Sequence, residues 1–204
     1  MKQVLCAKLV CHPASPVAGV VNIAVEVFTD SAGAARVMFE LDAEPGVLAT
    51  LVMPAPRPPA AADQLWRHTC GELFVALPGD TAYREFNFSP SGAWAGYAFS
   101  DYRTPDPMVD ALSVSVTRVT MDRHPGGWRL SGLLPPGSLS DEPEMPVMEV
   151  ATTMVLETTG GALSYWALRH PAAQPDFHHR DGFLSIELNN IEQNHVEQNH
   201  ANRP

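Results

Sequence analysis

Residues 21–41 read VNIAVEVFTDSAGAARVMFEL, and this stretch decides the fold class. Residues 21–28 alternate large apolar side chains with smaller or polar ones, which is the period of a strand with one buried face. Residues 29–33 read TDSAG, a composition typical of turns, and the alternation resumes at residues 36–41. The stretch therefore predicts a β-hairpin.

The same alternation returns along the rest of the chain. It is clear in LSVSVT at residues 112–117, where the aliphatic side chains would face a core and the hydroxyls would face solvent. One short helical turn is expected just before Trp66. Further strands are predicted at residues 4–10, 71–77, 83–88, 94–100, 127–133, 149–157, 163–169 and 183–188. Their spacing predicts an all-β protein, an antiparallel immunoglobulin-like or jelly-roll β-sandwich.

Composition supports this fold class and indicates the domain organisation. The 204 residues include 19 prolines and 14 glycines, which suit many short strands joined by turns. We predict one domain over residues 1–188. Residues 189–204 contain the repeated sequence EQNH and almost nothing apolar to bury, so they are predicted to be a disordered tail.

Charge and cysteine content exclude several classes of partner. The formal net charge is -10, and no run of Lys and Arg could neutralise successive phosphates, so we expect no nucleic-acid partner. No stretch approaches the roughly 20 apolar residues of a membrane helix. The three cysteines lack CxxC spacing, and the N-terminus lacks a signal-peptide core. We therefore expect a cytoplasmic protein with a small-molecule partner and no membrane contact, and the sequence names no protein partner.

Four polar side chains are predicted to share the outer surface of one sheet. Alternation puts Glu72 on one face of its strand, and Tyr83, Glu85 and Asn87 on one face of the next. Carboxylates and amides exchange hydrogen bonds with sugar hydroxyls. The pattern favours a non-catalytic binding site for a small polyhydroxylated ligand such as a sugar, and the alternative is an ordinary solvated sheet face.

Three tryptophans are candidate stacking surfaces for such a ligand. Trp66 and Trp94 lie beside predicted loops, which favours exposure, and in SYWALR at residues 164–169 either parity of Trp166 could face outward. An aromatic ring can cover the apolar face of a pyranose. We therefore include Trp66, Trp94 and Trp166 in the predicted ligand-binding set.

The segment HPAAQPDFHHRD at residues 170–181 suggests a different site. Histidine is a common metal ligand, so His178 and His179, joined by His68 through folding, are candidate ligands for a divalent metal or haem b. The same histidines with a neighbouring acid could serve an enzyme. No HxH or HExxH spacing and no acid-rich calcium loop is present. We predict no resident cofactor and keep these as alternatives.

Catalysis has less support in the sequence. SPSG at residues 89–92 is turn chemistry rather than a nucleophile elbow. Glu72 and Glu85 could form the carboxylate pair that glycoside hydrolysis requires. An open sheet surface, however, lacks the enclosure that raises the pKa of an acid. We therefore predict no catalytic residues.

Several strings in the chain resemble a bacterial DOMON-like subgroup that is related to family 9 carbohydrate-binding modules. They are LWRHTC at 65–70, YREFNFSPSG at 83–92, LSYWALRHP at 163–171 and PDFHH at 175–179. The resemblance covers most of residues 35–188. It implies an immunoglobulin-like sandwich with ligand-binding relatives.

The resemblance also implies two kinds of ligand. Some DOMON domains bind haem b through Met and His, and family 9 modules hold sugar between aromatic rings. Family 9 modules commonly carry acidic residues shortly after the Trp, whereas this chain has RHT at residues 67–69, so the resemblance does not extend to a calcium site.

Overall fold

Two antiparallel sheets form the framework of the described chain, which covers residues 1–109, 114–139 and 147–188 in a computed structural model. The smaller sheet has the order β1-β3-β4-β10-β9, with β1 (Lys2–Lys8), β3 (Val20–Thr29), β4 (Ala35–Ala43), β10 (Gly127–Leu134) and β9 (Arg118–His124). The predicted hairpin is β3 and β4, in which Val25 lies opposite Phe39. The tail predicted at residues 189–204 lies outside the described residues.

The larger sheet has the order β2-β12-β11-β5-β6-β7-β8. Its strands are β2 (Val10–Cys11), β12 (Leu163–Ala167), β11 (Val147–Glu157), β5 (Cys70–Ala76), β6 (Tyr83–Phe88), β7 (Trp94–Asp101) and β8 (Thr104–Pro105). A further strand, β13 (Leu184–Glu187), pairs with the first residues of β11, so it continues the row of β12. The short helices of the described residues are α1 (Pro45–Leu48), η1 (Leu65–Arg67) and η3 (Arg180–Gly182).

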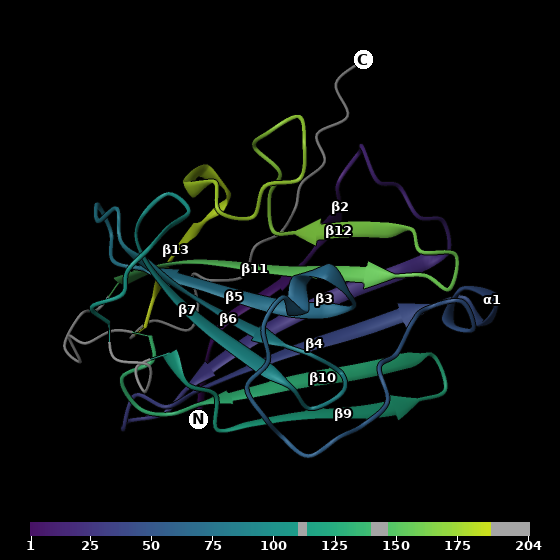
Figure 1. The fold of residues 1–204 in the computed structure, drawn as a ribbon, viewed down its shortest axis with the longest axis horizontal. Coiled ribbons are helices and arrows are strands. Elements are labelled where there is room, and N and C mark those ends of the chain that lie inside the picture. Colours follow the sequence, from purple (N-terminus) through teal and green to yellow (C-terminus); the bar gives the residue numbers. More distant parts are fainter. Residues whose placement is uncertain (110–113, 140–146, 189–204) are drawn as a thin grey trace.

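The two sheets stack face to face around one main core. In Figure 1 the strands of the larger sheet follow one another from top to bottom in the order β11, β5, β6, β7. The strands of the smaller sheet follow one another in the same direction, in the order β3, β4, β10, β9. Side chains from both sheets meet between them, including Phe39 of the smaller sheet and Leu73, Phe86 and Met154 of the larger one. The prediction of an antiparallel β-sandwich is confirmed.

The alternation of apolar and polar residues explains which side chains are buried in the smaller sheet. In the larger sheet it explains only the burial of the inner face. On β4 the inward Val37, Phe39 and Leu41 are buried, and the outward residues between them are half-buried or exposed. On β5 every residue is buried, on both faces. The outer face of the larger sheet is therefore covered by other parts of the chain.

Two covers lie on that outer face. Near η1, Leu65 packs with Cys70 and Ala95, and it closes the end of the sheet where β5 begins. At the other end Phe183 packs with Phe74 and Tyr83, so the segment that leads into β13 lies across β5 and β6. Between the two covers part of the face stays open.

A glycine permits a close contact between the two sheets. A Cβ built at Gly132 on β10 would lie 2.3 Å from the ring of Phe88 on β6. The ring occupies the place of that missing side chain, which lets the two strands approach. Gly132 is thus a packing requirement rather than a turn residue.

The strand predicted at residues 112–117 is wrong over its described part. Residues 112 and 113 lie outside the described residues, and residues 114–117 form no strand. Val114 and Val116 are buried in the main core, and the Val114 carbonyl lies so close to Gly96 that a Cβ there would collide with it. The alternation therefore reflects the burial of these valines in the core rather than pairing with another strand. The next strand of the chain, β9, begins at Arg118.

Candidate functional site

Strands β5 and β6 bring three polar side chains together on the open part of the outer face. Glu72 lies opposite Asn87, and Glu85 lies two residues before Asn87 on the same strand. Directly opposed residues share a face, as do residues two apart, so all three point the same way, as the sequence pattern predicts. Glu72 and Glu85 are diagonal neighbours, a relation in which backbones lie roughly 7–8 Å apart.

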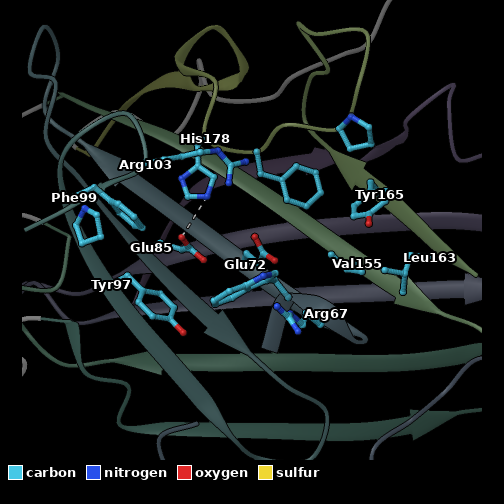
Figure 2. Close-up of a pocket in the computed structure, with 14 residues that line it drawn as sticks. Arg67, Glu72, Glu85, Tyr97, Phe99, Arg103, Val155, Leu163, Tyr165 and His178 are labelled. Atoms are coloured by element: carbon cyan, nitrogen blue, oxygen red, sulfur yellow. Dashed lines mark ion pairs between the residues drawn. The ribbon is translucent and has the colours of Figure 1, made fainter. Parts of the chain in front are cut away.

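A cavity of about 510 Å³ stands over these acids, and we call it the Glu72–Glu85 pocket. Figure 2 shows both carboxyl groups pointing into it, with Arg67 on one side and His178 on the other. The volume falls within the range of small-molecule sites, roughly 300–1,000 Å³. Its lining comprises Trp66, Arg67, Glu72, Glu85, Tyr97, Phe99, Arg103, Pro105, Val155, Leu163, Tyr165, Pro175, Phe177 and His178.

The floor of the pocket is polar and almost fully buried. The Asn87 amide donates to Glu85 Oε1 at 2.7 Å, and the Thr153 hydroxyl donates to Glu72 Oε2 at 3.2 Å. The second oxygen of Glu72, Oε1, is buried and has no hydrogen-bond partner among the described residues. A buried acceptor of this kind costs about 1–3 kcal/mol when it is left unpaired.

Enclosure changes the acidity of both carboxyl groups. Burial raises the pKa of Glu72 well above its ordinary value, and the charge of Glu85 raises it further. Burial also raises the pKa of Glu85 to about 7, against the opposing effects of the Asn87 hydrogen bond and the Arg103 charge. The expectation that an open sheet surface would leave these acids unperturbed is therefore wrong, because the two covers enclose them.

His178 enters the pocket from the C-terminal cover. Its Nδ1 lies 2.8 Å from the hydroxyl of Tyr83, and that hydroxyl accepts the Arg103 backbone N–H at 3.0 Å. Which of the two atoms donates in the contact between Tyr83 and Nδ1 depends on the tautomer of the ring. Nε2 lies 3.8 Å from Glu85 Oε2. Burial, followed by the charge of Arg103, lowers the pKa of His178 to about 4.

Arg103 is held at the rim by unusual backbone geometry. It has a φ of 51° in the tight connection between β7 and β8, a left-handed conformation that non-glycine residues seldom adopt. Its guanidinium pairs with Asp176 at 3.0 Å, and Asp176 also accepts the hydroxyl of Tyr102 at 2.8 Å. The charge of Arg103 is therefore shared with Asp176 at the edge of the pocket.

Aromatic rings form the walls. Trp66 is 38% exposed and meets Tyr97 edge to face, with ring centroids 5.5 Å apart. Phe99 lies on the same side of β7 as Tyr97, and Tyr165 meets Phe177 at 5.9 Å on the opposite side of the pocket. The site thus combines a polar floor with apolar, aromatic sides.

The other two predicted tryptophans do not reach this pocket. Trp94 lies opposite the core residue Phe88 and packs against the main core. Trp166 is 7% exposed in the same core, and its Nε1 donates to Ser164. Strand parity turns both rings inward, so neither ring lines the Glu72–Glu85 pocket.

The structure does not bring the three candidate metal-binding histidines together either. His68 is exposed and pairs with Glu157 at 2.7 Å, and His179 caps η3 by accepting the Asp181 N–H. Across residues 1–109, 114–139 and 147–188, no three His, Cys, Asp or Glu side chains lie close enough to hold a metal ion. Of the three candidate histidines, only His178 lines the Glu72–Glu85 pocket.

Sequence reasoning missed several lining residues. Tyr97 lies opposite Glu85 in register and Phe99 follows it by two, so their parity could have placed them on the site face. Arg103 and Phe177 come from loops, where alternation gives no signal.

None of the helices in the described part of the chain is long and apolar enough to cross a membrane.

Comparison with protein-family models finds no match, and comparison with curated protein sequences finds none either. Solved structures with a similar fold include a protein from Bacteroides uniformis ATCC 8492 described as a candidate carbohydrate-binding protein. It has a TM-score of 0.62 and 14% identity, over 90% of this chain and 86% of that one. They also include a family 9 carbohydrate-binding module from Caldicellulosiruptor kristjanssonii, solved in complex with cellotriose. Its TM-score is 0.59 at 11% identity, over 95% of this chain and 87% of that one. At these identities the likeness is one of fold.

Proposed function

We propose that this chain is a DOMON-like binding module that holds a small polyhydroxylated ligand, a sugar or sugar derivative, in the Glu72–Glu85 pocket. The observation that carries the proposal is the buried, unpartnered Oε1 of Glu72 on the pocket floor. A ligand hydroxyl that donates to this oxygen would remove the cost of leaving it unpaired. Because Glu72 sits on a central strand, this acceptor is held in a fixed position.

The walls fit the apolar part of such a ligand. Trp66 presents part of its ring to the cavity, and Tyr165 and Phe177 line the same cavity. A pyranose has apolar C–H faces and a polar rim, so it can lie against a ring while its hydroxyls reach the floor. The fold also supports the proposal, since the module solved with cellotriose has the same architecture.

Haem fits the pocket poorly. DOMON domains that bind haem use Met and His ligands, yet the described lining includes His178 and no methionine. Met148 and Met154 are buried in the main core between the sheets. In addition, Nδ1 of His178 is bonded to Tyr83, and Nε2 faces Glu85. The donor set therefore does not match the haem alternative.

A thermal-shift screen with mono- and disaccharides tests the proposal. A ligand present at 100 times its Kd should stabilise the protein by about 2.7 kcal/mol. Replacing Trp66 with Ala should weaken binding about tenfold or more, equivalent to about 1.4 kcal/mol, because the stacking surface is lost. Met108→Ala, a change at a side chain that is 89% exposed and outside the pocket lining, is the control and should leave affinity unchanged. A screen in which no sugar raises the melting temperature would contradict the proposal.

One observation favours a second function. Glu85, with a pKa of about 7, stands beside a second buried acid, and this is the arrangement of a general acid with a partner carboxylate. Glycoside hydrolysis is therefore the competing proposal. Incubation with a set of chromogenic aryl glycosides separates the two, since a binding module releases no phenolate. Release that is lost in both Glu72→Gln and Glu85→Gln would favour the enzyme.

A further inference from the structure

The two floor acids lack a cation of their own. The charge of Arg103 acts on both, but its guanidinium is half exposed and is paired with Asp176 at 3.0 Å. Arg67 also lines the pocket, and its side chain is exposed. His178 points Nε2 at Glu85 as a neutral ring. The pocket floor therefore has two buried carboxyl groups and, among the described residues, no positive charge bonded to either.

Buried charges in proteins are stable when they are paired and hydrogen-bonded. A ligand cation seated between Glu72 and Glu85 would supply the missing charge. An ammonium group also has three N–H donors, which suit the unpartnered Glu72 Oε1 and the neighbouring carboxyl group of Glu85.

The walls favour a cation as well. Figure 2 shows Tyr97 and Phe99 beside Glu85, and both line the cavity. Aromatic ring faces attract cations within roughly 6 Å, more strongly where water is excluded. The aromatic rings and the carboxyl groups at this end of the pocket therefore both attract a cation.

We propose that the Glu72–Glu85 pocket selects ligands that carry a primary ammonium, and that its sugar ligand is an amino sugar of the hexosamine class. This inference rests on the proposed sugar-binding function and goes further by naming the ligand's charge. The ammonium lies between the two carboxyl groups, and the ring lies against Trp66. A neutral sugar would leave one carboxyl group without a charged partner.

The pH dependence of binding follows from the same geometry. Ammonium binding requires ionised carboxylates, so protons are released and affinity rises as pH increases from 5.5 to 7. At higher pH the amino sugar itself loses its proton, which opposes further gain. A neutral sugar that accepts a hydrogen bond from a protonated carboxyl group behaves in the opposite way. The other titratable or charged groups around the pair are Arg67 in η1, Tyr83 on β6, Tyr97 on β7, Arg103 in the β7–β8 turn, Asp176 and His178 in the C-terminal cover, and Cys70 at the start of β5.

Isothermal titration calorimetry with four probes tests the inference: glucosamine, glucose, N-acetylglucosamine and cyclohexylamine. Phosphate buffer is used, because Tris and imidazole could compete. Glucosamine should bind at least tenfold more tightly than glucose or N-acetylglucosamine at pH 7, where its ammonium is still protonated, and this preference should shrink at pH 5.5. Glu72→Gln and Glu85→Gln should each remove most of the preference for glucosamine over glucose. Glu44→Gln, an exposed acid by α1 that does not line the pocket, is the matched control.

The outcomes separate this inference from the proposed function. Equal binding of glucose and glucosamine overturns the ammonium selectivity and leaves the sugar module standing. Binding of cyclohexylamine without any sugar supports the cation site and overturns the sugar module. If none of the four probes binds at millimolar concentration, both proposals fail.

Discussion

Glu85→Gln should make the protein more stable at neutral pH and flatten its stability profile. The carboxyl of Glu85 has an ordinary pKa of 4.5 and a folded-state pKa of about 7, raised by burial. Below the lower value both the folded and the unfolded state are protonated. Between the two values the unfolded state loses its proton first, so the folded state binds more protons and stability falls as pH rises. Above about 7 the loss is complete.

The magnitude follows from the size of that rise. A change from 4.5 to about 7, at about 1.4 kcal/mol for each pH unit, corresponds to about 3 kcal/mol. For a domain of this length that equals roughly 6–12 °C in Tm. Gln has the same shape and keeps a carbonyl oxygen that can accept the Asn87 amide bond, now 2.7 Å long. Relief of the charge on Glu72 adds to the effect, because the two acids titrate as a pair.

Urea denaturation of both proteins at pH 4.5, 5.5, 6.5 and 7.5 measures the difference. Subtracting one profile of unfolding free energy against pH from the other cancels the contributions of groups that titrate alike in both proteins, since distant sites contribute additively. The variant should gain little at pH 4.5 and about 3 kcal/mol at pH 7.5. Glu44→Gln, an exposed carboxyl, should run parallel to the parent at every pH. A Glu85→Gln profile that is also parallel to the parent would refute the buried-acid argument.

Two further substitutions test the packing around the site. Gly132→Ala places a methyl group 2.3 Å from the ring of Phe88, so urea denaturation should show a loss of about 1–3 kcal/mol. Gly46→Ala, where a Cβ meets nothing within 4 Å, should cost nothing, and equal losses in the two variants would contradict the close-contact reading. Tyr83→Phe removes the hydroxyl that joins Arg103 to His178, and it should cost about 1–3 kcal/mol in the same assay. Unchanged stability in Tyr83→Phe would show that this hydroxyl does not hold the C-terminal cover.

Alternation predicted those parts of the fold in which one face of a strand meets the core. It located β4 through Val37, Phe39 and Leu41, and it matched β6 at residues 83–88. It also put Glu72 and Glu85 on one face, because a period of two fixes parity once two strands are neighbours. These features depend on local sequence and on one pairing.

The features that it missed depend on distant parts of the chain. β9 lies at the edge of the smaller sheet and pairs with β10 alone, so its sequence RVTMDRH is largely polar and resembles a loop. The neighbouring loop predicts an exposed Trp94, whereas its pairing with the core residue Phe88 turns it inward. The enclosure of the acids comes from the cover near η1 and from the segment containing Phe183, and neither has a periodic signal.

That enclosure is what connects stability with function in this molecule. β5 and β6 lie inside the larger sheet with strands on both sides, so Glu72 and Glu85 cannot move far to reach water. Their burial lowers the stability of the protein at neutral pH, and on an ordinary sheet surface exposed acids would avoid this cost. A ligand that pairs with both carboxyl groups offsets the cost on binding, since anything that binds only the folded state stabilises it. The acids that make the ligand-free sheet less stable are therefore the groups expected to bind most of the polar part of the ligand.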